Sequence, residues 1–345
     1  RGGRVAAPSA TEPRAGARPS RRLTYVEGVI EGLAEMMRAD PDVFLMGQDI
    51  GPFGGTMQST AGLWDEFGYG RVMDTPISEM GTAGLAVGAA MQGLKPVMEI
   101  SFGEFLASAM NEVVTQAPGV YYYTGGRAHC PVVFRTKVGD GPYRGHPQCF
   151  ESWFMHIPGL KTVMPAFPDD CKGLMVAAIR DPNPVLFVED MYLYHAIRGE
   201  VPEGLYETPI GQARVVREGK DATVIATGWY VHKALAAGRQ LAQQGIEIDI
   251  VDPRTLSPLD LDTILASVKK TGRAVTAHEA WKIGGVGAEI AAEIAEEGFR
   301  YLRAPIVRVG APHVPVPIPK PLRDTYLPDV PDIVAAVKRV VAFTT

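Results

Sequence analysis

Apolar residues recur along the chain in two patterns that alternate from Leu23 onward. One is a short apolar run bounded by Gly, Pro or charged residues, which is typical of a strand buried on both faces. The other spaces apolar residues three and four positions apart, as on one face of a helix. Its first instance follows Thr24, a residue that can cap a helix, and ends at Asp40-Pro41. Short buried strands that alternate with helices predict parallel sheets covered on both faces, an α/β fold.

Two such units follow one another. Strands of the first unit are predicted at 43–46, 72–73, 96–100, 132–134, 162–164 and 185–188, and its later helices near 82–93, 104–117 and 169–180. Residues 196–210 are rich in Gly, Pro and charge, and they interrupt the pattern. The second unit has predicted strands at 222–227, 246–251, 274–277 and 306–309, and predicted helices at 231–244, 259–269, from GGVG to about 297, and at 331–341. We therefore predict two doubly wound domains, over 23–200 and 201–345.

Residues 1–22 differ in composition from the rest of the chain. Arginine occurs in this segment at positions 1, 4, 14, 18, 21 and 22, against a single acid, Glu12, and the apolar core of a secretory signal is missing. We expect a flexible segment outside the fold. An Arg-rich, acid-poor segment is also typical of organelle transit peptides. We therefore expect a bacterial cytoplasmic protein, with the mitochondrial matrix as the alternative.

Composition excludes several classes of function. The formal net charge is −5 and no basic stripe is interleaved with aromatic residues, which argues against nucleic-acid binding. The apolar segment 80–94 contains several glycines and is too short to span a membrane. The cysteines Cys130, Cys149 and Cys171 form no CxxC pair, so neither a disulfide framework nor a zinc cluster is predicted.

Glu79 stands at the start of a predicted helix of small and apolar residues. Ser78 is a plausible cap, and an acid in the first turn stabilises a helix by about 0.3–1 kcal/mol. Gly81, Gly84 and Gly88 fall on one face of this helix and permit close approach by another backbone or a ring. Two interpretations follow: Glu79 stabilises the helix start, or it is a sequestered carboxylate that shares a proton with a ligand nitrogen.

Two glycine-rich segments and one histidine are further candidates. Gly-Asp-Gly at 139–141 opens a motif that binds magnesium and thiamine diphosphate, but the asparagine that completes the motif is absent between 141 and 182, so we predict a tight turn. GGVG at 284–287 opens a helix; phosphate binding and a simple strand-to-helix turn are both open, and the turn is favoured. His146 lies in a long loop with Gly and Pro around it, and is either a surface residue or a proton donor.

The order of several segments makes a family recognisable. The chain contains, in sequence, DTPISEMG, GLAVGAAMQGLKPVMEI, HIPGLKTVMP, KGLMVAAIRDPNPVLFVE, DPRTLSPLD and GGVGAEI. Over about residues 23–340 it closely resembles the beta subunit of the decarboxylating component of 2-oxo acid dehydrogenase complexes, which act on pyruvate, branched-chain 2-oxo acids or acetoin. The resemblance implies a transketolase-like pair of domains, an N-terminal pyrimidine-binding domain and a C-terminal transketolase domain.

The resemblance also implies half of an active site. In this family an alpha subunit carries the complete motif for Mg²⁺ and the diphosphate, and α2β2 heterotetramers bind thiamine diphosphate between subunits. Glu79 matches the glutamate that hydrogen-bonds N1′ of the cofactor's pyrimidine. Phe105 matches the aromatic residue against that ring, Ser101 lies in the same EISFGEF segment and is expected at the cofactor, and His146 matches a histidine that assists transfer to a lipoyl group. Residues that match a potassium-binding loop are Val132, Ala178, Ile179, Asp181 and Asn183.

Four departures from the family pattern stand out. The chain has GHPQ around His146 where members usually have QHSQ, and the loop from Arg135 to His146 is shorter. Gln48-Asp49 replaces a pair of acids, and Arg323 stands where an acid is common. The segment APHVPVP resembles acetoin-type members more than pyruvate-type members.

From the resemblance we predict a catalytic beta subunit, incomplete alone, that helps to decarboxylate a 2-oxo acid and passes the acyl group to a lipoyl domain, with a lipoyl acyltransferase core as a further partner. Two alternatives remain. One is a subunit of a carboligase that joins two carbonyl compounds without a lipoyl partner, which the altered loop around His146 motivates. The other is a non-catalytic partner subunit, against which the presence of Glu79 speaks.

Overall fold

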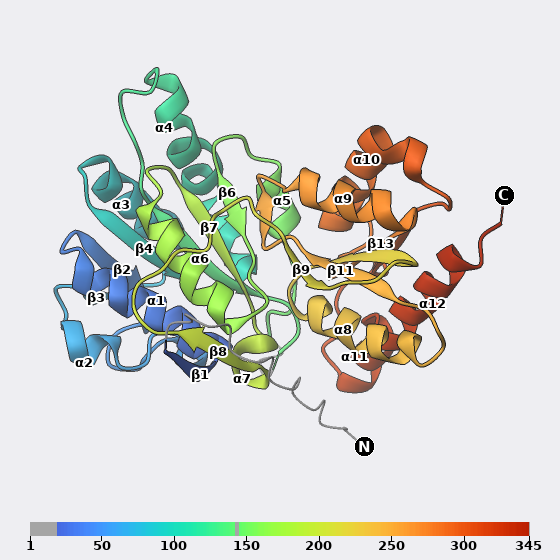
Figure 1. Cartoon of the computed structure of the whole chain (residues 1–345). Helices are drawn as coiled ribbons and strands as arrows, with labels where there is room; N and C mark the ends of the chain where they lie inside the picture. The colour runs from blue at the N-terminus through green and yellow to red at the C-terminus, as the bar shows by residue number, and fades with distance from the viewer. Residues whose placement is uncertain (1–18, 142–144, 345) are drawn as a thin grey trace.

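The computed structural model describes residues 19–141 and 145–344, which form two α/β units side by side (Figure 1). Each unit has a central sheet with helices on both faces, as the alternating pattern predicts. The N-terminal unit is the larger of the two. No helix within the described residues is long and apolar enough to cross a membrane.

The first sheet has seven strands in the order β12-β6-β7-β5-β4-β2-β3. Its strands are β2 (Val43–Gly47), β3 (Val72–Asp74), β4 (Lys95–Ile100), β5 (Val133–Val138), β6 (Lys161–Val163), β7 (Val185–Asp190) and β12 (Thr255–Ser257). All neighbours pair in parallel except β12, which runs antiparallel to β6. The carboxyl ends of β2 to β7 therefore lie at one edge of the sheet, where α/β proteins place their ligands.

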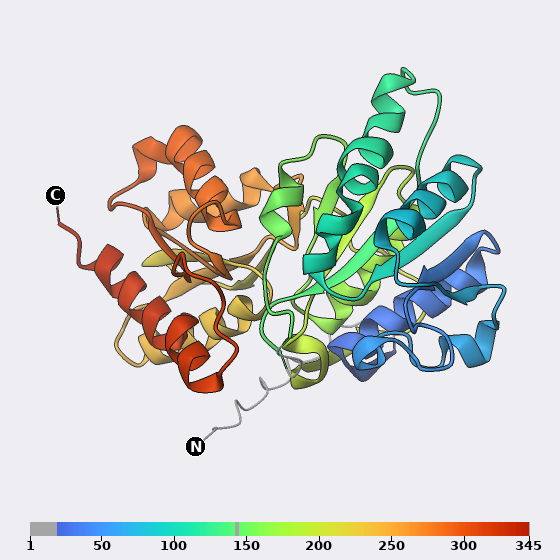
Figure 2. The same cartoon turned by 180° about the vertical axis from the view of Figure 1, so that it is seen from behind.

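Two groups of helices cover this sheet. The N-terminal unit contains α1 (Tyr25–Ala39), η1 (Thr56–Gln58), α2 (Leu63–Phe67), α3 (Glu79–Met91), η2 (Gly103–Ala109), η3 (Asn111–Gln116), α4 (Ala117–Tyr123), α5 (Glu151–Met155), α6 (Pro168–Arg180) and α7 (Leu193–Ala196). Helices α1 and α6 share a core with Leu45 and Val97, whereas α3 shares a core with Met46 and Met98 on the opposite face (Figure 2). Alternate side chains of each strand thus point to opposite faces.

The second sheet has five strands in the order β14-β13-β10-β11-β9. Its strands are β9 (Arg214–Arg217), β10 (Ala222–Ala226), β11 (Ile248–Asp252), β13 (Ala274–Trp281) and β14 (Val307–Ala311), and only β9 pairs antiparallel. The C-terminal unit also contains α8 (Trp229–Ala242), α9 (Leu261–Thr271), α10 (Val286–Gly298), η4 (Phe299–Tyr301), α11 (Lys320–Tyr326) and α12 (Val330–Val341). Helices α8 and α12 contribute to one core and α9 and α10 to the other, so the two-sided cover that the sequence predicts is present.

Both ends of the N-terminal unit differ from the sequence prediction. Residues 20–22, which we expect in the flexible segment, belong to β1 (Ser20–Thr24), which pairs antiparallel with β8 (Arg198–Pro202). Polar strands with no apolar run give no signal of their own, and only this mutual pairing orders them. The rest of the expected tail, residues 1–18, lies outside the described residues, and the boundary predicted at residue 200 falls inside β8.

Two local predictions in the N-terminal unit have different outcomes: the cap of the first helix is confirmed, whereas the segment near 104–117 is not a single helix. Thr24 caps α1 in a capping box with Glu27, as its position suggests. The single helix predicted near 104–117 is instead a 3₁₀ helix, then a π-helix, then α4. Apolar spacing indicates a helix but does not reveal whether its hydrogen bonds span three, four or five residues, so this difference was not predictable from the pattern.

Candidate active site

The loops after four neighbouring parallel strands carry the predicted catalytic and cofactor residues. Gln48 follows β2, Glu79 follows β3, Ser101 and Phe105 follow β4, and His146 follows β5. These strands pair in parallel in the order β5-β4-β2-β3, so their carboxyl ends share one edge. The fold therefore gathers residues that are far apart in the sequence at a single candidate site.

Glu79 is the first residue of α3 and is half-buried. Ser78 occupies the cap position, as predicted, but its side chain makes no capping hydrogen bond. The amide Nε2 of Gln48 donates a hydrogen bond of 3.1 Å to Oε1 of Glu79. The carboxylate is thus held by a neutral donor from the loop after β2, and its second oxygen can serve another donor.

The face of α3 that carries Gly81, Gly84 and Gly88 is exposed in this chain. A Cβ atom at Gly88 would meet nothing within 4 Å, and one at Gly84 would meet only the Cγ atom of Glu112, at 3.9 Å. Beside the glycines, the side chain of Leu85 is 62% exposed. The close approach that Gly84 and Gly88 permit is therefore not used by the described residues of the chain, and this part of the face is open to another molecule.

His146 is held by residues of the segment after β4. Its Nδ1 atom lies 2.7 Å from Oε2 of Glu104, and the backbone N–H of Gln148 donates to the other oxygen of Glu104 at 3.3 Å. The imidazole stacks on Phe102 with centroids 4.8 Å apart and meets Phe105 edge-on at 4.7 Å. The ring orientation is thus fixed, and Nε2 lies on the side opposite Glu104.

Two partners of His146, Glu104 and Phe102, were not found from the sequence. Nothing in the segment EISFGEF distinguishes Glu104 from a surface acid, because its contact with His146 spans 42 positions of the chain. Phe105 was predicted to pack against the pyrimidine ring of the cofactor. Among the described residues, its ring contacts those of His146 and Phe102. Ser101 is buried at the end of β4, and its predicted contact with a cofactor stays a prediction.

A layer of buried charge lies beneath this edge of the sheet. Glu99 of β4 pairs with Arg135 at 2.7 Å and with Lys137 at 2.5 Å, both on β5. Ser59, from the segment after β2, donates to Glu99 at 2.7 Å. Burial opposes the ionisation of Glu99, but the two cations outweigh it and lower the pKa of its carboxyl. This network connects the loop after β2 to the sheet. Glu99 lies inside the strand predicted at 96–100, but Arg135 and Lys137 lie beyond the end of the strand predicted at 132–134, so the pairing was not predicted.

The Gly-Asp-Gly segment, which the sequence predicts to be a tight turn, bends the chain after β5. Gly139 has a φ of +86°, and a Cβ atom there would lie 3.2 Å from a carboxylate oxygen of Glu279. At Gly141 a Cβ atom would lie 2.8 Å from Cβ of Met191. Both glycines are therefore required by close packing. The carboxylate of Asp140 pairs with Arg323 at 2.7 Å.

The second glycine-rich segment also has a packing explanation. Residues 284 and 285 lie in the turn between β13 and α10, Gly287 lies in the first turn of α10, and a Cβ atom at Gly287 would lie 2.8 Å from the ring of His278. Burial lowers the pKa of His278 to about 4, so the ring is neutral beneath this turn. The segment is a strand-to-helix turn over a buried ring, which agrees with the favoured interpretation.

The residues that match a potassium-binding loop lie around the C-terminal end of α6. This helix contains Ala178 and Ile179, Asp181 caps it, and Asn183 and Val132 flank the paired strands β7 and β5. Lys161 lies 2.6 Å from the Asp181 carboxylate, whereas Oδ1 of Asn183 is buried without a hydrogen-bond partner among the described residues. An unpaired carbonyl oxygen at this point suits a cation, and the ion itself stays a prediction.

Both units of the chain match models of known protein families. Residues 21–195 match the family model of the transketolase pyrimidine-binding domain, and residues 211–333 match that of the transketolase C-terminal domain. A solved structure described as a split gene transketolase, inactive beta4 tetramer, superposes with a TM-score of 0.76 and covers 94% of this chain and 99% of its own, at 23% identity. This likeness confirms the two-domain fold.

Curated relatives are similar over nearly the whole chain. The pyruvate dehydrogenase E1 component subunit beta of Rhizobium meliloti is 44% identical over 321 residues, which cover 92% of this chain and 70% of that protein. The acetoin:2,6-dichlorophenolindophenol oxidoreductase subunit beta of Cupriavidus necator is 42% identical over 333 residues (93% and 98%), and the 2-oxoisovalerate dehydrogenase subunit beta of Bacillus subtilis is 41% identical over 322 residues (93% and 98%). The chain therefore belongs to the transketolase-like family of 2-oxo acid dehydrogenase E1 component beta subunits.

Proposed function

We propose that this chain is the beta subunit of a thiamine diphosphate-dependent 2-oxo acid dehydrogenase, of the pyruvate or acetoin type, and that it is active only with an alpha subunit. The observation that carries the proposal is the placement of Glu79. Its carboxylate stands at the carboxyl edge of the parallel sheet, is bound by Gln48 at 3.1 Å, and adjoins a helix face that the chain leaves open.

The residues at this edge fit the pyrimidine end of the cofactor. Gln48 engages only Oε1 of Glu79, so Oε2 can share a proton with N1′ of the ring. Because Gln48 is neutral, it orients Glu79 without repelling its charge. When bound, thiamine diphosphate supplies the carbon nucleophile that attacks the 2-oxo group. The task of Glu79 is to hold the proton at N1′ that makes the pyrimidine amino group a base.

His146 is assigned to the transfer step at the mouth of the site. Acyl transfer to a lipoyl disulfide leaves one sulfur acylated and the other as a thiol, which needs a proton. Glu104 binds Nδ1 of His146 at 2.7 Å, so the proton is exchanged at Nε2. The two phenylalanine rings at 4.8 and 4.7 Å limit rotation of the imidazole.

The diphosphate and Mg²⁺ are assigned to the alpha subunit. Among residues 19–141 and 145–344, no group of three His, Cys, Asp or Glu side chains is placed to hold a metal ion. Asp140, the acid of the Gly-Asp-Gly turn, is engaged by Arg323 instead. We propose that the alpha chain docks on the glycine face of α3 and on the neighbouring tyrosines, since Tyr122 and Tyr123 of α4 are 83% and 79% exposed. An α2β2 heterotetramer would bury both.

The alternative functions have less support. None of the named relatives above is a carboligase, so only the altered loop around His146 speaks for that alternative. A non-catalytic partner subunit would have no use for a carboxylate held at the carboxyl edge by Gln48. The dehydrogenase function is therefore the better supported one, with a lipoyl acyltransferase core as a proposed further partner.

Potassium binding at the C-terminal end of α6 is a separate part of the proposal. If Asn183 and the neighbouring backbone carbonyls bind the ion, the midpoint of thermal unfolding should be higher in KCl than in NaCl at equal ionic strength, because ligand binding to the folded state stabilises it. Equal midpoints across the two salts would remove potassium from the account.

The function is tested by reconstitution with an alpha subunit of the same family. The mixture should reduce an artificial electron acceptor with pyruvate, acetoin or 2-oxoisovalerate as substrate, and the choice among them identifies the type. The chain alone should show neither turnover nor tight cofactor binding. Product formation by joining two carbonyl compounds, without transfer to a lipoyl domain, would instead establish the carboligase alternative.

A further inference from the structure

We infer that Arg323 and Glu279, both in the C-terminal unit, are positioning residues that hold His146 in place by fixing the loop on which it lies. The inference rests on the proposed function of His146 and names the groups through which the second unit acts on it. Neither residue contacts the imidazole in the described structure; they contact Asp140, at the start of the same loop.

The start of the loop is bound by two contacts from the C-terminal unit. The backbone N–H of Asp140 donates to Oε1 of Glu279 on β13, and the carboxylate of Asp140 pairs with Nη1 of Arg323 on α11 at 2.7 Å. Gly139 brings the backbone close enough for the first contact, since a Cβ atom there would press on Glu279 at 3.2 Å. The backbone and the side chain of one residue are thus both fixed by the other unit.

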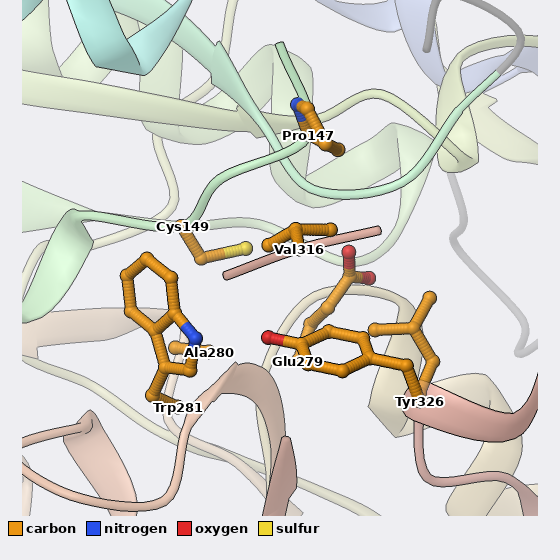
Figure 3. A pocket seen from close by; sticks show the side chains of 8 residues that line it. Pro147, Cys149, Glu279, Ala280, Trp281, Val316 and Tyr326 are labelled. Atoms are coloured by element: carbon orange, nitrogen blue, oxygen red, sulfur yellow. The ribbon is translucent and has the colours of Figure 1, made fainter. Parts of the chain in front are cut away.

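The end of the loop lies on the same unit. Pro147 and Cys149 line a small pocket together with Glu279, Trp281 and Tyr326 (Figure 3). The ring of Phe150, the next residue, lies 5.9 Å from that of Trp281. Glu279 therefore takes part at both ends, and the chain on each side of His146 packs against the C-terminal unit.

Burial and charge make the contact with Arg323 specific. The Arg323 side chain is 5% exposed and that of Asp140 is 21% exposed, so the pair is largely removed from water. Burial, and then the neighbouring Asp190, raise the pKa of Glu279 well above its ordinary value. The raised pKa favours the neutral form of the Glu279 carboxyl, which lessens its repulsion of Asp140, and the charge of Asp140 is balanced by Arg323.

His146 itself is bound by the other unit, through Glu104, Phe102 and Phe105. The N-terminal unit sets the orientation of the ring, and the C-terminal unit sets the path of the loop that carries it. Two of the departures from the family pattern meet here: the shorter loop contains Asp140, and Arg323 replaces an acid. An acid at position 323 would repel Asp140, whereas Arg323 pairs with it.

The test compares Arg323→Met, His146→Ala and the double variant in the reconstituted complex. Methionine keeps apolar volume but removes the cation. Arg323→Met should lower kcat/KM for a free lipoyl domain by about tenfold or more, since a catalytic group displaced by about 1 Å can cost about a hundredfold. It should also increase hydrogen exchange in peptides that cover 145–150. In the His146→Ala background, Arg323→Met should cause no further loss, because it acts through that residue.

Lys320→Met is the matched control. Lys320 lies on the same helix and pairs with Asp324, and the two side chains are 60% and 58% exposed. Hydrogen exchange and activity should therefore match those of the parent protein. Unchanged exchange in Arg323→Met would overturn the inference, as would losses that multiply in the double variant. If His146→Ala retains full activity, the proposed function of His146 is wrong. Raised hydrogen exchange in Arg323→Met would then show that the ion pair between Arg323 and Asp140 orders the loop without serving catalysis.

Discussion

Glu79→Gln is expected to reduce turnover of the reconstituted complex by about 10²- to 10⁴-fold, the range that a positioned proton-transfer group supplies. Glutamine has nearly the same shape and can still accept the hydrogen bond from Gln48, but its amide cannot share a proton with a ring nitrogen. The α2β2 assembly should therefore persist while catalysis is lost. Steady-state turnover with an artificial electron acceptor measures the effect, and sedimentation reports assembly.

Glu66→Gln is a suitable control for this variant. Glu66 is an acid of the same unit, on α2, and its side chain is 39% exposed in a pair with Arg38. An exposed pair of this kind contributes little to stability, so turnover and assembly should be unchanged. Turnover near that of the parent in Glu79→Gln would remove Glu79 from the mechanism, whereas loss of assembly in that variant would make its role structural.

His146→Ala should impair acylation of a lipoyl domain much more than it impairs decarboxylation coupled to an artificial acceptor. The reason is that the proton supplied at Nε2 is needed by the second lipoyl sulfur, which the artificial acceptor does not present. A loss of about 10²-fold or more in the lipoyl assay is expected for a general acid. The two assays, run on one preparation, separate the transfer step from the earlier ones.

His156→Ala serves as the control, because His156 is exposed at the end of α5 and lies on the same stretch of chain. In His156→Ala, acylation of the lipoyl domain and decarboxylation with the artificial acceptor should both proceed as in the parent protein. A His146→Ala variant that loses the same fraction of activity in both assays would show that His146 acts before transfer. The role proposed for the ring would then be wrong, although Glu79 and the fold would be unaffected.

Hydrophobic spacing predicts the parts of this fold that depend on local sequence. The parallel strands of both sheets are buried on two faces, so β2 and β10 appear as largely apolar runs and β5 begins with one, and the helices between the strands show a regular apolar spacing. Strands that exist only through distant pairing were missed. β12 comes from the C-terminal part of the chain yet joins the first sheet beside β6, and β1 is ordered by β8.

Some residues of the candidate site could likewise be found from the local sequence, and others could not. Glu79 and His146 stand in short segments whose composition is unusual, a glycine-rich helix start and a Gly- and Pro-rich loop, so they could be found by inspection. Glu104 and Arg323 could not, because their partners lie 42 and 183 positions away and neither segment shows a local pattern. Such contacts follow from the assembled fold. The sequence did reveal that Arg323 was unusual, and the structure supplies its partner.

The central claim is that this chain provides one side of a cofactor site that an alpha subunit completes. Calorimetric titration of thiamine diphosphate with Mg²⁺ tests it most directly, carried out on this chain alone, on the alpha chain alone and on the reconstituted complex. We expect tight binding only in the complex, with one site for each αβ pair, and only weak binding by this chain. Tight, Mg²⁺-dependent binding by this chain in the absence of the alpha subunit would contradict the claim.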